Sequence, residues 1–199
     1  MPRTLLNNFQ SKPTDTPVWE KNGWLGDANC AIKAMTYNFD MSEYLKSFIE
    51  IMNDCFNDYE KIPVIVPTAD WGVGNSPVWN TIYVLGVETL LDFYNDTEYA
   101  NELYPNLRQF ALNDIDELES LGWVWGTRGL SDWVAPAGKE DIEEAQAEVN
   151  DRPDPKIIIP ALFLHLTSLL SLMQRHPAGQ ALLHRPHSTH RAVSTTGRR

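Results

Sequence analysis

The sequence has only two cysteines, and it has no apolar run long enough to cross a membrane. Cys30 and Cys55 fall on apolar positions of predicted helices, so we expect buried free thiols rather than a disulfide. No cluster of cysteine and histidine has zinc-site spacing, and there is no nucleotide, metal or flavin motif, so we expect no cofactor and no metal. The N-terminus has no apolar segment of signal-peptide length, which favours a cytoplasmic protein.

Basic residues are also scarce over most of the chain. The sequence has 27 acidic and 16 basic residues, which gives a formal net charge of −11. All the acidic residues precede Gln174, and residues 174–199 carry five arginines instead. An acidic body of this kind disfavours nucleic acid and anionic membranes as partners.

Acids and tryptophans are plentiful, and they are concentrated in residues 13–28, Pro-Thr-Asp-Thr-Pro-Val-Trp-Glu-Lys-Asn-Gly-Trp-Leu-Gly-Asp-Ala. Pro17 removes a backbone donor, and we expect turns at Gly23 and Gly26, so this segment is a loop rather than a regular helix. Acids and indoles in a loop favour a solvent-facing, functional role. The carboxylates of the loop are Asp15, Glu20 and Asp27, and its indoles are Trp19 and Trp24.

This combination of side chains is typical of carbohydrate chemistry. Indoles stack on the C–H face of a sugar, carboxylates accept hydrogen bonds from hydroxyls, and a protonated carboxyl can protonate a glycosidic oxygen. Repulsion from Asp15 and Asp27, with desolvation by an indole, would keep Glu20 protonated near neutral pH, as a general acid requires. The alternative is that these acids are solvated loop charges and helix caps, with Asp27 the N-cap of the following helix.

Residues 15–28 resemble the signature of the bacterial α-L-rhamnosidases of glycoside hydrolase family 78. That signature reads Asp-Cys-Pro-x-Arg-Glu-Lys-x-Gly-Trp-x-Gly-Asp. The resemblance implies that Glu20 is the general acid, that Trp24 is the sugar-facing indole, and that Asp15 and Asp27 bind the sugar.

The chain departs from this signature at two positions. Thr16 replaces the cysteine, and Trp19 replaces the arginine, which removes one charged partner of the site. The family inverts the anomeric centre, with a general acid and a general base roughly 6.5–9.5 Å apart. The family's base lies on a loop beyond the resembling segment, so no residue is assigned to it, and Asp70 and Asp132 are candidate substitutes.

Two further loops repeat the combination of aspartate and tryptophan. One carries Asp70 and Trp71, and the other carries Asp132 and Trp133. In a toroid of helices such loops fall on one rim, where they would form one pocket with the first loop. We therefore expect Trp71, Asp132 and Trp133 to bind the substrate.

Helical periodicity dominates the rest of the chain, and no long strand pattern alternates with it. Ser42 and Ser76 are the expected N-caps of two helices, and Gly122 is an expected helix stop. Paired helices with loops between them indicate an all-α fold, and the resembled family implies a partial (α/α)6 toroid with about five of its helices. The predicted helices are residues 27–39, 42–57, 77–94, a short helix to Leu103, 105–121, 141–149 and 157–172.

The chain divides into three predicted segments. Residues 1–12 are a lead-in, residues 13–173 are a partial α/α-barrel catalytic domain, and residues 174–199 are a basic, disordered tail. The active-site-like loop stands almost at the start, which suggests a missing upstream part. The resemblance ends near Met173, and we hypothesise that a change of reading frame there truncated the protein.

The resemblance implies an inverting glycoside hydrolase that acts on terminal α-L-rhamnosides in an oligosaccharide or glycoside. Because the general base is not assigned, we expect the isolated chain to be weakly active or inactive. One alternative is a non-catalytic carbohydrate-binding module on an α-toroid scaffold, which would keep the tryptophans without depending on Glu20. Another alternative is a nonfunctional fragment whose helices only form a core.

Overall fold

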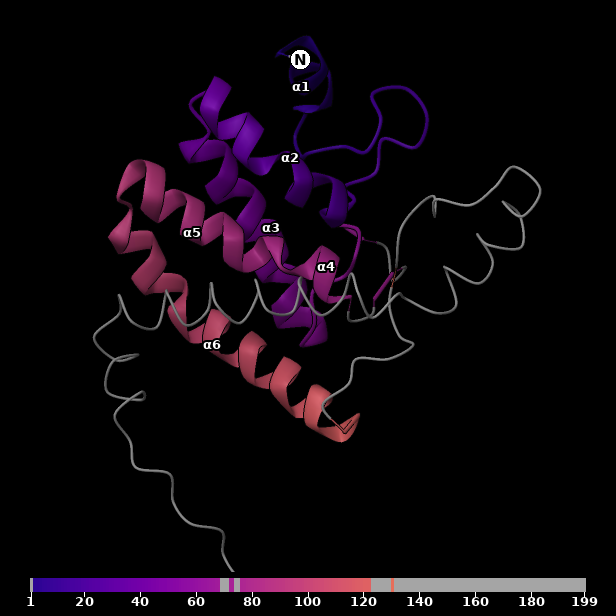
Figure 1. Cartoon of the computed structure of the whole chain (residues 1–199), viewed down its shortest axis with the longest axis vertical. Coiled ribbons are helices and arrows are strands. Elements are labelled where there is room, and N and C mark those ends of the chain that lie inside the picture. Colours follow the sequence, from indigo (N-terminus) through magenta and orange to yellow (C-terminus); the bar gives the residue numbers. More distant parts are fainter. Residues whose placement is uncertain (1, 69–71, 74–75, 123–129, 131–199) are drawn as a thin grey trace, which may run out of the picture.

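The computed structural model describes residues 2–68, 72–73, 76–122 and 130, and this part of the chain is all-α (Figure 1). Within these residues there is no strand, only two isolated bridges, and none of the helices is long and apolar enough to span a membrane. The helices predicted at 141–149 and 157–172, and the tail at 174–199, lie outside the described residues. The helices are α1 (Pro2–Asn8), α2 (Leu25–Asn38), α3 (Ser42–Tyr59), α4 (Pro77–Asn80), α5 (Ile82–Tyr94) and α6 (Thr97–Ser120).

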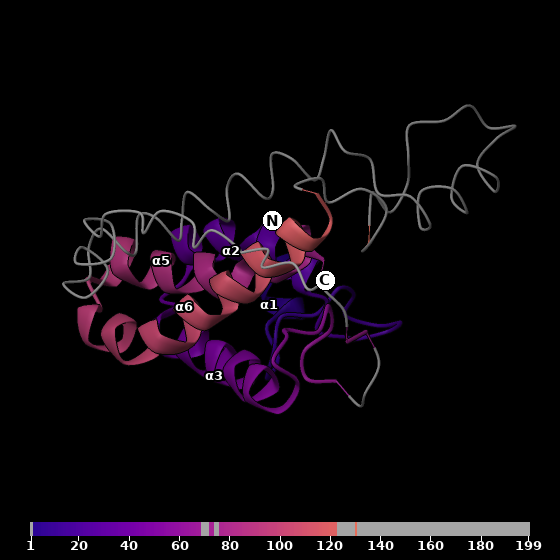
Figure 2. The ribbon, with the colours of Figure 1, turned by 90° about the horizontal axis from the view of Figure 1, so that it is seen from below.

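Helix α5 is the centre of the core, because it packs against α2, α3 and α6 (Figures 1 and 2). A helix that is apolar on nearly all sides belongs in such a position. Gly86 on α5 lets α3 approach closely, since a Cβ there would lie 3.1 Å from Cδ1 of Ile49. The most deeply buried apolar residues of α5 are Ile82, Tyr83, Val84, Val87 and Leu90.

An aromatic cluster joins α5 to the two helices that flank it. The ring of Tyr83 lies 5.5 Å from that of Phe110 on α6 and 6.2 Å from that of Phe56 on α3. Phe56 and Phe110 also meet edge to face at 6.1 Å. The Tyr83 hydroxyl donates to Oδ1 of Asn53 at 2.8 Å, so its polar end is satisfied where its ring is buried.

The start of α2 differs from the prediction. The helix begins at Leu25, two residues early, and Asp27 lies in its first turn, so the prediction that Asp27 is the N-cap is wrong. The cause is a tertiary contact: the Leu25 N–H donates to the carbonyl of Val64 at 2.9 Å, which fixes the entry of the chain into the helix. Trp24 takes the N-cap position, and its carbonyl accepts from the N–H of Ala28.

Two serines that we expected as N-caps do not cap with their side chains. Ser42 is the first residue of α3, and its N–H donates to the carboxylate of Asp40 at 3.2 Å, so its own capping role is wrong. Ser76 does occupy the N-cap of α4, but its hydroxyl accepts from the N–H of Leu130 instead. The short helix α4 is separated from α5 at Thr81, where one continuous helix was predicted.

Helix α6 is continuous through Pro105, where we predicted two helices. A proline deprives the carbonyl four residues before it of its helical partner. Here Pro105 and Asn101 are both exposed, so water can satisfy that carbonyl. The predicted stop is confirmed: Gly122 follows the helix with a φ of 72°, a left-handed conformation that glycine adopts without strain.

The two cysteines differ in burial. Cys55 is buried as predicted, but Cys30 is exposed, so that prediction is wrong. Helix α2 buries Ala28, Ile32 and Met35 on its core face. Cys30 lies two positions after Ala28, which at 3.6 residues per turn places it away from that face.

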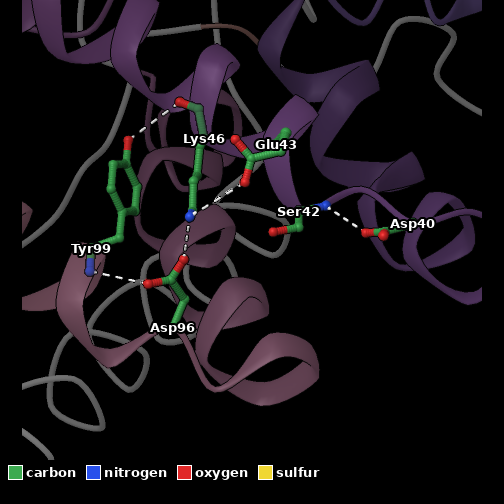
Figure 3. A network of polar contacts seen from close by, with 6 residues as sticks. All are labelled: Asp40, Ser42, Glu43, Lys46, Asp96 and Tyr99. Atoms are coloured by element: carbon green, nitrogen blue, oxygen red, sulfur yellow. Dashed lines mark hydrogen bonds and ion pairs between the residues drawn. The ribbon is translucent and has the colours of Figure 1, made fainter.

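A polar network ties α3 to the start of α6 (Figure 3). Asp96 caps α6 by accepting from the N–H of Tyr99 at 3.2 Å, and its other oxygen lies 2.6 Å from Nζ of Lys46 on α3. The Tyr99 hydroxyl donates to the carbonyl of Lys46, and Glu43 adds a weaker ion pair at 3.6 Å. The hydrogen bond from Lys46 holds the pKa of Asp96 below its ordinary value of 3.8.

We expect Asp96→Ala to destabilise the protein by about 1 kcal/mol through the lost cap alone. Asp96→Asn is the matched control, because its side-chain oxygen can still cap α6 while the charge on Lys46 loses its partner. Chemical denaturation at pH 7 should therefore rank wild type, Asn and Ala in falling order of stability. Equal stability of the Asn and Ala variants would contradict the capping role.

The same pair makes stability depend on pH in a definite direction. A lowered pKa of Asp96 stabilises the fold above pH 3.8, and this stabilisation is lost as the pH falls through the lowered value. The difference in unfolding midpoint between wild type and Asp96→Asn should thus shrink on acidification.

Candidate functional site

The segment that carries Asp15 and Glu20 is a loop, as predicted, and Asp15 and Asn22 close it, whereas Asp27 lies in α2. The N–H of Asp15 donates to the carbonyl of Asn22 at 3.1 Å, and the N–H of Asn22 donates to Oδ1 of Asp15 at 2.9 Å. One carboxylate oxygen of Asp15 is thereby used to hold the loop in shape. Val18 and Trp19 stand at the exposed tip, where 85% of the Trp19 surface is accessible.

The base of the loop is anchored on residues 62–66, which are buried. The N–H of Val66 donates to the carbonyl of Gly23 at 2.9 Å, and Trp24 forms an isolated antiparallel bridge with Ile65. A Cβ at Gly23 would overlap the carbonyl of Val66, so this glycine is needed for close approach of two backbones.

Gly26 does not lie at a turn, which corrects the prediction. It is the second residue of α2, and a Cβ there would come within 2.6 Å of Nε1 of Trp79. The small residue makes room for the indole that follows the second loop. Asn29 fixes the same region, because its amide donates to the carbonyl of Val78 at 3.2 Å.

A buried asparagine makes hydrogen bonds to the anchor of the loop and to the start of α4. Asn80 donates to the carbonyl of Ile62, and its Oδ1 accepts from the N–H of Ser76 at 2.6 Å. These bonds satisfy backbone groups that would otherwise be buried without partners. Asn80 therefore joins residues 62–66 to the start of α4.

Glu20, the predicted general acid, lies at the surface next to Trp24. Its Oε2 accepts from the indole N–H of Trp24 at 2.9 Å and from the amide of Asn22 at 3.5 Å. Glu20 is exposed, whereas Trp24 and Asn22 are half-buried. The indole that was predicted to face the sugar thus contacts the predicted acid directly.

Asp27, in the first turn of α2, interacts electrostatically with Asp15 and Glu20, the two acids of the loop. Burial raises its pKa above the ordinary value of 3.8, the charges of Asp15 and Glu20 raise it further, and its own backbone N–H opposes the change. Asp27 is nevertheless exposed to solvent over part of its surface, so the protein around it desolvates it only in part. The structure therefore places Asp27 within electrostatic reach of both Asp15 and Glu20.

A cavity of about 420 Å³ lies between α1, α2 and the start of α4, and two of the three acids line it. Asp15 and Asp27 contribute to its wall, while Glu20 and Trp24 do not. Trp79 lies in the predicted helix 77–94 and is not among the predicted site residues, although a tryptophan just after an Asp/Trp loop could have indicated this place. The apolar lining residues are Leu5, Pro13, Ala28, Ala31, Met35, Val78 and Trp79.

The other predicted substrate contacts, Trp71, Asp132 and Trp133, lie outside the described residues, as does Asp70. In the part of the chain that the structure describes, no group of three or more His, Cys, Asp or Glu residues could hold a metal ion.

Comparison with known proteins identifies what the chain resembles. The sequence profile of the bacterial alpha-L-rhamnosidase 6 hairpin glycosidase domain matches residues 1–180, which include the predicted lead-in. An alpha-L-rhamnosidase of Formosa agariphila is 28% identical in an alignment 156 residues long, which covers 67% of this chain and 15% of that protein. An alpha-L-rhamnosidase of Alteromonas sp. (strain LOR) is 23% identical in an alignment 175 residues long, which covers 83% of this chain and 18% of that protein.

The fold has a counterpart among solved structures. The structure of alpha-L-rhamnosidase from Dictyoglumus thermophilum matches with a TM-score of 0.66 at 21% identity, over 90% of this chain and 18% of that one. The chain thus spans less than a fifth of the length of these relatives. Together with the helices described above, these matches confirm the predicted all-α partial toroid and the resemblance.

We expect Asp27→Asn to stabilise the protein at pH 7. Because the pKa of Asp27 is raised, ionising it costs more in the folded than in the unfolded state, so wild type loses stability as the pH rises above 3.8. The Asn variant does not ionise, so its melting temperature should exceed that of wild type at pH 7 and differ less at pH 4. Asp116→Asn, which removes a charge from an exposed position of α6, is the matched control.

Gly23→Ala should disrupt the anchor of the loop. The added methyl group would meet a backbone carbonyl, which cannot move aside as a flexible side chain could. We expect a loss of stability of roughly 1–3 kcal/mol, as for other overpacked sites, measured by chemical denaturation. Gly122→Ala is the control. Its added methyl group would have no neighbour within 4 Å, so this variant should lose only the stability that the left-handed backbone conformation costs an alanine.

Proposed function

The chain belongs to the bacterial alpha-L-rhamnosidase six-hairpin glycosidase family, and on this premise we propose that it hydrolyses terminal α-L-rhamnosides with inversion, using Glu20 as the general acid. The observation that carries the proposal is the position of Glu20. Its carboxyl group is exposed to solvent, where a glycosidic oxygen can reach it, and one of its oxygens is held by the indole of Trp24.

The neighbouring acids are suited to bind the sugar. Asp15 and Asp27 line the cavity beside Glu20's loop, and carboxylates there can accept hydrogen bonds from sugar hydroxyls. Because one oxygen of Asp15 already accepts from Asn22, its second oxygen is the one left for substrate. The substrate we propose is a rhamnose-containing oligosaccharide or glycoside.

Inversion needs a second carboxylate, roughly 6.5–9.5 Å from the acid, to activate water on the opposite face of the sugar. No residue of this chain is matched to the base that the resemblance implies. We therefore propose that the chain by itself turns over slowly, and that its share of the chemistry is proton donation and sugar binding.

The dependence of turnover on Glu20 tests this function. With an aryl and an alkyl α-L-rhamnoside as substrates, we expect Glu20→Gln to lower kcat by about 10²–10⁴-fold, the usual contribution of a general acid. The loss should be greater with the alkyl rhamnoside, because a poor leaving group needs protonation more. Glu119→Gln, the same substitution at an exposed position of α6, is the control.

Sugar binding gives a second readout that does not need turnover. L-rhamnose at millimolar concentration should raise the melting temperature of wild type and of Glu20→Gln, and should raise that of Asp15→Asn less. A shift in all three without any hydrolysis would indicate a non-catalytic binding module instead. Hydrolysis that survives Glu20→Gln with both substrates would refute the assignment of the acid.

A further inference from the structure

The contact between Trp24 and Glu20 is directed through the indole N–H. Nε1 of Trp24 lies 2.9 Å from Oε2 of Glu20, and the amide nitrogen of Asn22 reaches the same oxygen at 3.5 Å. Within the described residues, no hydrogen bond reaches the other oxygen, Oε1. The two oxygens of this carboxyl group therefore have different surroundings.

The donor is the rigid partner in this contact. The backbone of Trp24 bridges Ile65, and its carbonyl accepts the first hydrogen bond of α2 from Ala28. Its ring is half-buried, whereas Glu20 is exposed on the loop. A fixed donor next to an exposed acid restricts the rotamers of the acid, which is what positioning requires.

We propose that Trp24 is a positioning residue for Glu20, and that the site uses its indole N–H to hold Oε2 so that Oε1 carries the proton. This inference rests on the proposed function and gives Trp24 a role other than stacking on the sugar. Asn22, which the family signature does not specify, supports the same oxygen more weakly.

The contact can contribute more to the transition state than to the ground state. As the glycosidic C–O bond breaks, the proton on Oε1 passes to the leaving oxygen, which keeps the bonding electron pair. Water adds to the anomeric carbon and gives its proton to the second carboxylate. Glu20 becomes anionic in this step, so the N–H bond to Oε2 becomes charge-assisted and stronger.

The direct test is the pH dependence of the Trp24 indole N–H resonance in ¹⁵N-labelled protein, assigned by its loss in Trp24→Phe. We expect this resonance to shift in one step as Glu20 gains its proton, and the step to be absent in Glu20→Gln. The other charged groups of the segment are Asp15, Asp27, Lys12 and Lys21, so the step should persist in Asp27→Asn. A resonance that does not move with pH, or moves equally in Glu20→Gln, would overturn the proposal.

The resonance of Trp19 is the internal control. This indole lies in the same loop and is 85% exposed, and among the described residues it has no hydrogen bond to Glu20. Its resonance should not show the step that depends on Glu20. A step of equal size at both indoles would mean that both resonances respond to the charge of Glu20 at a distance. That result would also contradict the proposed hydrogen bond between Trp24 and Glu20.

Kinetics separate this proposal from the proposed function. Trp24→Phe keeps an aromatic ring and removes the N–H, so we expect kcat for the aryl rhamnoside to fall about tenfold while KM changes less than about twofold. If the Trp24 resonance shows the step but hydrolysis does not depend on Glu20, the contact between Trp24 and Glu20 is supported and the proposed function is refuted. If hydrolysis depends on Glu20 but the Trp24 resonance shows no step, only the proposed contact is refuted.

Discussion

The candidate site depends on a short backbone pairing between residues 23–25 and residues 64–66. Two hydrogen bonds, from Leu25 to Val64 and from Val66 to Gly23, join segments that are about forty residues apart in the sequence. The pairing needs a residue without a side chain at Gly23, and it sets both the base of the acidic loop and the first turn of α2. The positions of Trp24 and Asp27 follow from it.

The helices supply the rigid support for this pairing. Helix α5 is buried among α2, α3 and α6, and α4 places Trp79 against Gly26 and Asn80 against the carbonyl of Ile62. The amide of Asn29 on α2 adds a hydrogen bond to the carbonyl of Val78 on α4. The loop that carries Asp15 and Glu20 is therefore attached at both ends, by the bond from Thr14 to Asn8 and by the bond from Val66 to Gly23.

The charge of Asp27 opposes folding next to the candidate site. Burial raises the pKa of Asp27, and the charges of Asp15 and Glu20 raise it further. Ionised Asp27 is therefore unfavourable for folding, a cost that is common where perturbed pKa values are concentrated at functional sites. The indole N–H of Trp24 donates a hydrogen bond to the neighbouring carboxyl group of Glu20.

Much of this could be predicted from the sequence, because the responsible signals are local. Apolar residues at helical spacing indicated α2, α3, α5 and α6, and Gly122 indicated the end of α6. The acids and indoles of residues 13–28 predict a carbohydrate site, and that assignment stays a prediction. The errors occurred where local patterns compete with distant contacts: the start of α2, the continuity of α6 through Pro105 and the exposure of Cys30.

The sequence by itself thus determined where α2, α3, α5 and α6 lie and which loop is rich in acids and indoles, since both depend on neighbours within a few turns of the chain. Only the tertiary structure decided that Gly26 accommodates Trp79 and that α2 starts where Leu25 meets Val64. It also decided that Trp24 points its N–H at Glu20. These three features depend on how segments that are distant in the sequence pack together, and the periodicity of residues along the chain does not predict that packing.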